Sequence, residues 1–137
     1  MGSLTRTFPS TLDAAVDASA FVLEAAEAYG LSEDITQQML LVIGEAVANA
    51  AGHGNEFDPE KEVVVEVGVQ EAEVRLCVQD QGGGIPQDRL EHATLPDDLL
   101  QTSGRGLYIM KSLTDRIWIE GEGRRLCMMW RRVAAPS

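Results

Sequence analysis

The chain contains little of what cross-links a protein or carries it across a membrane. Its only two cysteines, Cys77 and Cys127, are far apart in the sequence and stand in apolar, strand-like runs. We therefore predict two buried thiols, and neither a zinc site nor a disulfide framework. No stretch approaches the ~20 apolar residues of a membrane span, and no signal-peptide pattern precedes the first predicted element. These absences predict a cytoplasmic protein without a membrane segment.

Positive charge is scarce as well. Eleven Lys and Arg residues stand against 22 Asp and Glu residues, which gives a formal net charge of -11. Contacts with DNA or RNA need clustered cations that release counterions from the phosphates, so we expect no direct nucleic-acid partner. A free nucleotide remains possible, because a local group of backbone N–H donors and one Mg²⁺ can offset an acidic surface.

Length and composition fit one domain. A chain of 137 residues, of which 45% are hydrophobic, can bury a core without cross-links. No window is long and polar enough to predict a disordered tail, and no internal repeat is present. We therefore expect residues 1–137 to form a single domain.

The apolar pattern predicts both strands and helices. The first half begins with an edge strand at residues 4–8, followed by a helix at 13–29 that Ser10 or Thr11 caps and a second helix from Ser32 to about Gly52. The second half has a hairpin of strands near 63–69 and 74–78, a loop at 86–103 with one helical turn, a short helix to 113, and strands near 116–121 and 125–133. This order predicts an α+β two-layer sandwich, in which helices cover one face of a mixed, mostly antiparallel sheet.

The second predicted helix carries a polar row beside its apolar stripe. Glu45, Asn49 and His53 are four residues apart, so at about 100° per residue they lie in line at the border of core and solvent. A carboxylate, a carboxamide and an imidazole suit metal binding and proton transfer. Polar residues at this spacing also occur on the solvated flank of ordinary helices, and Gly52 and Gly54 beside His53 also fit a simple helix end.

Two glycine-rich segments follow. Asp80-Gln-Gly82-Gly-Gly84 comes directly after a strand, where a carboxylate could accept a hydrogen bond from the amino group of adenine and the backbone could stay close to a ligand. An ordinary turn that begins with Asp explains the same residues. Ser103-Gly104-Arg105-Gly106-Leu107 opens a helix, whose free N–H groups suit phosphate oxygens. The GxxxxGK[ST] loop and the full GxGxxG fingerprint are both absent, so neither a Walker-type nor a Rossmann site is expected.

Taken together and in this order, the three segments resemble the N, G1 and G2 boxes of the GHKL superfamily. Over residues 5 to 133 the chain looks most like the small anti-sigma-factor serine kinases of bacteria, through an ExxxNAxxHG helix and a short lid that ends in SGRGL. The resemblance implies a Bergerat-type α/β sandwich that binds ATP with Mg²⁺. Gly83 and Ile85 depart mildly from the usual G1 pattern.

The resemblance also implies roles for single residues. Glu45 would be the general base, Asn49 would coordinate Mg²⁺, and Asp80 would read adenine. The other nucleotide-binding positions would shape the pocket and its lid: His53, Gly82, Gly84, Ile85, Ser103, Gly104, Arg105, Gly106 and Leu107. Arg105 and Lys111 could each contact a phosphate or a partner, and His53 could instead pack under the lid.

By the same resemblance, the chain would be a serine protein kinase that phosphorylates an anti-anti-sigma (antagonist) protein and sequesters a sigma factor. It would act as a homodimer, with Phe8, Phe21 and Val22 as candidate interface residues. One alternative is a nucleotide-dependent partner-switching module that moves no phosphate. A detached histidine-kinase domain fits poorly, because His53 and His92 are the only histidines and no helical hairpin carries a phosphoacceptor. A gyrase-like fragment also fits poorly, because we expect the chain to lack the further domain with which such enzymes complete their site.

Overall fold

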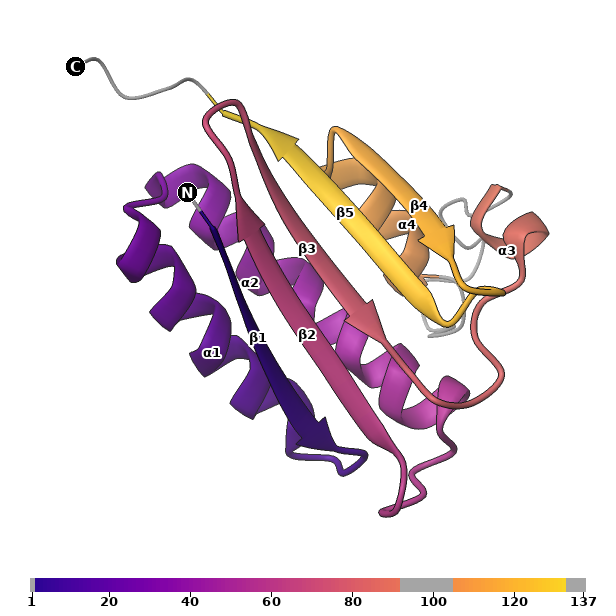
Figure 1. The fold of residues 1–137 in the computed structure, drawn as a ribbon. Coiled ribbons are helices and arrows are strands. Elements are labelled where there is room, and N and C mark those ends of the chain that lie inside the picture. The colour runs from indigo at the N-terminus through magenta and orange to yellow at the C-terminus, as the bar shows by residue number, and fades with distance from the viewer. Residues whose placement is uncertain (1, 92–104, 133–137) are drawn as a thin grey trace.

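The computed structural model describes residues 2–91 and 105–132. Helices lie behind an extended sheet (Figure 1). Along the chain the elements are β1 (Gly2–Pro9), α1 (Ala14–Tyr29), α2 (Glu33–Ala48), the π-helix η1 (Asn49–Gly54), β2 (Glu62–Val69), β3 (Glu73–Gln79), α3 (Gln87–Glu91), α4 (Arg105–Leu113), β4 (Arg116–Glu120) and β5 (Arg125–Arg131). This order agrees with the prediction, and the fold is the expected α/β sandwich.

The strands of the described chain form one sheet in the order β1-β2-β3-β5-β4, and its four pairings are all antiparallel. β2 and β3 are joined by the predicted hairpin, in which Gln70 N donates to Glu73 O at 2.9 Å. After β3 the chain passes through α3, α4 and the edge strand β4 before it returns as β5 beside β3. The last residue of β3, Gln79, therefore pairs with the first residue of β5, Arg125.

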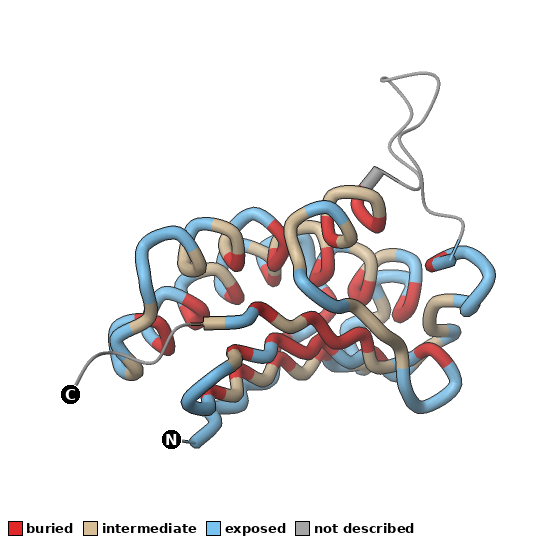
Figure 2. The backbone as a smooth tube through the Cα atoms, turned by 90° about the horizontal axis from the view of Figure 1, so that it is seen from above, coloured by how far each residue is buried: buried red, intermediate tan, exposed pale blue. Residues whose placement is uncertain are grey.

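The core lies between the helices and one face of the sheet. Buried residues gather where the helices meet the strands (Figure 2). On β2 the alternating valines predicted from the sequence are buried: Val63, Val65, Val67 and Val69. Phe8, Phe21 and Val22 also belong to this core, so their proposed place in a dimer interface is wrong. None of the described helices is long and apolar enough to cross a membrane.

The start of α1 differs from the prediction. Neither Ser10 nor Thr11 caps this helix; its N-cap is Asp13, whose side chain makes no capping hydrogen bond. Ser10 is buried, and its hydroxyl donates to Lys61 O at 2.6 Å instead. The predicted start of the second helix at Ser32 is confirmed, because Ser32 is its N-cap and its hydroxyl accepts a hydrogen bond from the N–H three residues later at 3.2 Å.

The end of the second helix differs as well. The sequence predicts an α-helix to about Gly52, but α2 ends earlier and continues as η1. Asn55 N donates to Ala50 O at 2.8 Å, which is the i→i+5 bond of a π-turn. The end of η1 is also tied to the segment after β3, because Gly83 N donates to Gly54 O at 3.2 Å. This contact between distant segments is invisible to a local helix pattern.

The two cysteines are not free thiols. Cys77 on β3 and Cys127 on β5 face each other in the sheet register and form a disulfide. Their predicted burial is confirmed, but the prediction of unpaired thiols is wrong. The pairing depends on the register between β3 and β5, which the spacing of the two cysteines in the sequence does not reveal.

Candidate functional site

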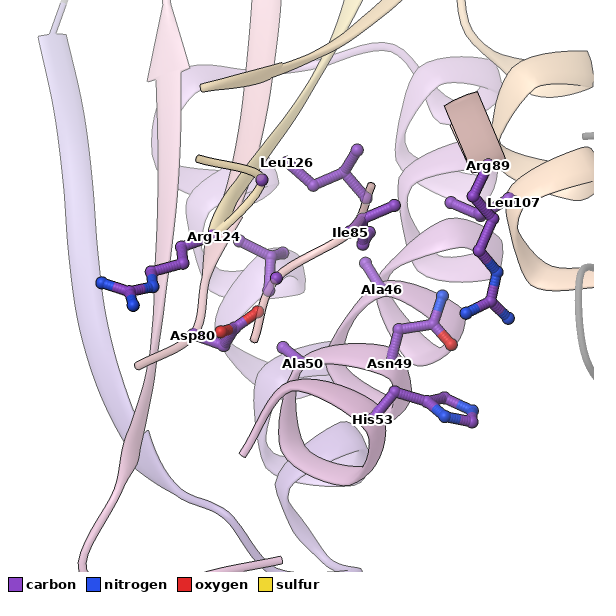
Figure 3. Close-up of a pocket in the computed structure, with 13 residues that line it drawn as sticks. Ala46, Asn49, Ala50, His53, Asp80, Ile85, Arg89, Leu107, Arg124 and Leu126 are labelled. Carbon is purple, nitrogen blue, oxygen red and sulfur yellow. The ribbon is translucent and has the colours of Figure 1, made fainter. Parts of the chain in front are cut away.

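The end of α2 and the start of η1 form one wall of a pocket. Asn49 and His53 line it together with Ala46 and Ala50. In a π-turn, four residues make slightly less than one full turn, so His53 stays on the same side of the helix as Asn49. Figure 3 shows the Asn49 carboxamide and the His53 imidazole side by side along this wall. The polar row predicted from the sequence thus borders a pocket at two of its three positions.

Asp80 follows β3 directly and lines the same pocket from the sheet side (Figure 3). Only 5% of its surface is exposed. Its Oδ1 accepts a hydrogen bond from Gly82 N at 2.8 Å, and its backbone N–H donates to Arg124 O at 2.8 Å. The glycine loop that follows therefore holds the carboxylate, and the β4–β5 turn holds the backbone of Asp80.

Burial raises the pKa of the Asp80 carboxyl above its ordinary value of 3.8, because the charged form loses its water. Hydrogen bonds from the backbones of Gly82 and Gly84 and the positive charges of Arg124 and Lys61 act in the opposite direction, but they do not outweigh the burial. A desolvated carboxylate with a raised pKa in a concave site is a typical feature of ligand-binding positions.

The loop after Asp80 needs glycine at two positions. Gly82 packs directly against the carbonyl group of Gly54, so that a Cβ there would overlap it. Gly84 has a φ of +73°, and a Cβ on it would lie 2.6 Å from the Gly123 carbonyl carbon. Ile85 N donates to Gly123 O at 2.8 Å. The loop is thereby held between η1 and the β4–β5 turn, with its backbone at the pocket.

The pocket has both an enclosed part and an open mouth. Its cavity volume is about 30 Å³. Ligand pockets usually measure about 300–1,000 Å³, so this cavity can hold only a small part of a nucleotide. The lining is mainly apolar with a few polar groups: Ala46, Asn49, Ala50, His53, Val78, Asp80, Gly84, Ile85, Arg89, Leu107, Gly123, Arg124 and Leu126. A ligand of nucleotide size would therefore fill the mouth as well as the interior.

Glu45 stands at the edge of this pocket. It lies one turn before Asn49 on α2, is half-buried, and does not line the hollow itself. A Cβ on Gly106 would lie 2.8 Å from Glu45 Oε2, so the start of α4 covers this carboxylate. Leu107, the next residue of α4, is buried and lines the pocket. The structure thus brings residues of all three sequence segments to one place.

Ser103 and Gly104 lie outside the described residues, as does His92, and the side chain of Arg105 is not described. Lys111 does not line the pocket; its Nζ donates to Glu91 O at 3.3 Å and thereby links α4 to α3.

Sequence reasoning missed the role of Asn55. This side chain is fully buried, and its Nδ2 donates to Ser10 Oγ at 2.8 Å and to Glu62 O at 3.0 Å. Its Oδ1 accepts from Gln81 N at 2.8 Å, directly beside Asp80. Asn55 thus fixes the loop that carries the buried carboxylate. An Asn after two glycines suggests only a turn, and the partners are distant in the sequence.

Two arginines of the pocket were also missed. Arg124, in the β4–β5 turn, donates from Nε to Gly82 O at 2.8 Å. Arg89 reaches the pocket from α3, in a segment that the sequence predicts mainly as a loop. The only local signal for either residue is its positive charge in an acidic chain, which does not reveal where the side chain lies.

The chain is similar to a known family over most of its length. The model of the family described as histidine kinase-like ATPase domain matches residues 8–130. The chain belongs to this family. It is 34% identical to an anti-sigma F factor of Clostridium perfringens over 113 residues, which are 80% of this chain and 76% of the relative. It is 36% identical to an anti-sigma F factor of Geobacillus stearothermophilus over 93 residues, 65% of this chain and 62% of the relative. The alignment with the Geobacillus protein therefore spans less than two thirds of that protein.

Membership of the histidine kinase-like ATPase family implies ATP binding, and the side chains that line the pocket offer contacts for this ligand. Its apolar walls, which include Val78 and Leu126, fit a purine ring. The Asp80 carboxylate can accept a hydrogen bond from the exocyclic amine of adenine, whereas guanine has an acceptor oxygen at the corresponding position. The glycine loop lets the backbone approach the ligand closely.

Proposed function

We propose that this chain is an ATP-dependent serine protein kinase of the anti-sigma-factor type. It phosphorylates an anti-anti-sigma (antagonist) protein, and it sequesters a sigma factor until the antagonist releases it. One observation supports the proposal most strongly: Asn49 and Asp80, from segments far apart in the chain, lie on two walls of one pocket in an ATPase-family domain. Relatives named anti-sigma F factor that align with up to 80% of the chain support the biological role.

Asn49 is the proposed protein ligand of Mg²⁺. This ion prefers oxygen ligands, and it usually takes one or two from the protein and the rest from phosphates and water. A single carboxamide at the pocket wall fits that pattern. Among the described residues, no three or more His, Cys, Asp or Glu side chains are grouped so that they could hold a metal ion, so Mg²⁺ would take its other ligands from phosphates and water.

Glu45 is the proposed general base. When bound, ATP supplies the γ-phosphoryl group, and the protein's task is mainly positioning and charge neutralisation. The Glu45 carboxylate would take the proton of the antagonist's serine hydroxyl as the serine oxygen bonds to phosphorus and ADP leaves. Its place beside Asn49 and under Gly106 supports this role, because the hydroxyl must enter next to the metal.

Residues 1–137 would form a single domain that acts as a homodimer in the cytoplasm, where sigma factors work. With a net charge of -11, the protein would favour a partner surface that is positively charged. The alternative, a partner-switching module that binds ATP without transferring phosphate, shares the same pocket and differs only in the use of Glu45.

Phosphate transfer by wild type and Glu45→Ala distinguishes the two functions. With Mg-ATP and a candidate antagonist, the wild type is expected to form phosphoserine. Glu45→Ala should bind ATP and the partners normally but transfer phosphate about 10² to 10⁴ times more slowly, since general-base catalysis contributes that much. Glu27→Ala, on the exposed surface of α1, is the control. If the wild type binds ATP and the antagonist but transfers no phosphate, the function is that of a partner-switching module. If Glu45→Ala transfers phosphate as fast as the wild type, Glu45 is not the general base.

A further inference from the structure

The polar groups of the pocket separate into two ends. Asp80 and Arg124 lie at one end, and Asn49, His53 and Arg89 lie at the other (Figure 3). The first end is where the buried carboxylate would meet the base. Because all five residues line one hollow, its other end is where the phosphates of a bound nucleotide would lie.

A triphosphate in this protein needs a local cation. The net charge of -11 gives the protein a negative potential that repels an anionic ligand, and an arginine in a cleft can offset this potential locally. Among the described residues that line the pocket, only Arg89 and Arg124 carry a permanent positive charge. Arg124 is engaged at the adenine end, where its Nε donates to Gly82 O at 2.8 Å. Of the two arginines in the described lining of the pocket, this leaves Arg89 for the phosphates.

The position of Arg89 is set by its neighbours. Leu90 is buried and anchors the short helix α3 in the core. Lys111 on α4 donates to the last carbonyl of α3, at Glu91. Between these two contacts Arg89 projects to the mouth of the pocket and is itself exposed. Its guanidinium makes no ion pair or side-chain hydrogen bond with another residue in the described part of the chain.

We propose that Arg89 binds the terminal phosphates of the nucleotide. This inference rests on the proposed ATP site and adds a residue to it that no sequence motif marks. A guanidinium can donate two parallel hydrogen bonds to phosphate oxygens, which a neutral side chain of similar size cannot do. Arg89, Asn49 and its Mg²⁺ would hold the phosphates from two sides, across the mouth of the pocket.

Calorimetric titration with a series of ligands that differ in their number of phosphates tests this role. Arg89→Gln is expected to bind Mg-ATP about 10- to 100-fold more weakly, in keeping with hydrogen bonds to charged groups. The loss should shrink from ATP to ADP to AMP, and adenosine should bind as it does to the wild type. Arg89→Lys keeps the charge and should retain part of the affinity. The control is Arg131→Gln, at the end of β5 outside the pocket, which should leave all four affinities unchanged.

Two results would overturn the assignment. One is Arg89→Gln binding Mg-ATP as tightly as the wild type. The other is an equal loss for ATP and adenosine, because that would mean that the substitution disturbs the pocket rather than a phosphate contact. A wild type that binds neither ATP nor adenosine would refute the proposed nucleotide site itself, and this outcome is distinct from the other two.

Discussion

At the scale of single residues, Asp80 shows how a binding group can oppose stability. The fold buries the carboxylate, and the resulting loss of water raises its pKa. The folded protein therefore holds the proton more tightly than the unfolded chain does. Below the pKa of 3.8 in the unfolded chain, the Asp80 carboxyl is protonated in both the folded and the unfolded state, so no charge has to be buried on folding. As the pH rises through the raised pKa of Asp80 in the folded protein, the stability that comes from holding this proton is lost.

Asp80→Asn should therefore make the protein without nucleotide more stable at neutral pH. The carboxamide resembles the protonated acid, and its oxygen can still accept the hydrogen bond from Gly82 N. The gain in the free energy of unfolding over the wild type should be small near pH 4 and should grow towards pH 7. Denaturant titrations across this range measure it. Asp17→Asn, an exposed change on α1, should show no such pH-dependent gain; a wild type that is the more stable of the two at pH 7 would contradict the account of Asp80.

The sequence singled out Asp80 and Asn49 because each stands in a recognisable local motif. The roles of Asn55, Arg89 and Arg124 could not be predicted, because they come from contacts that the local sequence does not encode. Asn55, for example, hydrogen-bonds to Gln81, which is 26 positions away. Such contacts depend on how β1, β2 and the β3 loop meet in space, and no short pattern encodes that meeting.

At the scale of elements, the site depends on the contact between η1 and the loop after β3. Gly82 packs against the Gly54 carbonyl, and Gly83 N donates to the same oxygen at 3.2 Å. The order of strands and helices could be predicted from apolar periodicity, because that signal is local. The π-helical end of α2 could not, since it is fixed by this contact with a segment almost thirty positions later.

Gly82→Ala and Gly83→Ala form a matched pair for this contact. A methyl group on Gly82 would overlap the Gly54 carbonyl, whereas one on Gly83 would meet nothing within 4 Å. Gly82→Ala should lower the free energy of unfolding by about 1–3 kcal/mol, as overpacking typically does, and should weaken ATP binding. Gly83→Ala should stay within about 0.5 kcal/mol of the wild type. Equal effects of both changes on unfolding and ATP binding would mean that the close approach of the two segments does not shape the site.

At the scale of the whole molecule, the site depends on the connection between β3 and β5. The polypeptide leaves the sheet after β3, forms α3 and α4, re-enters the sheet as the edge strand β4, and then runs as β5 beside β3. The Cys77–Cys127 disulfide joins these two strands and so closes the segment that contains the glycine loop and both short helices. Cytoplasmic thiols are normally kept reduced, so under the proposed cytoplasmic location the bridge would describe an oxidised form of the protein.

We infer that this topology brings three segments of the chain around one adenine nucleotide. Titration of Mg-ATP and Mg-GTP into the wild type and Asp80→Asn measures it most directly. The wild type should prefer ATP over GTP by at least about tenfold, and Asp80→Asn should lose most of that preference, because the carboxylate is the group that distinguishes the two bases. Equal affinity of the wild type for both nucleotides, or an ATP preference unchanged in Asp80→Asn, would contradict it.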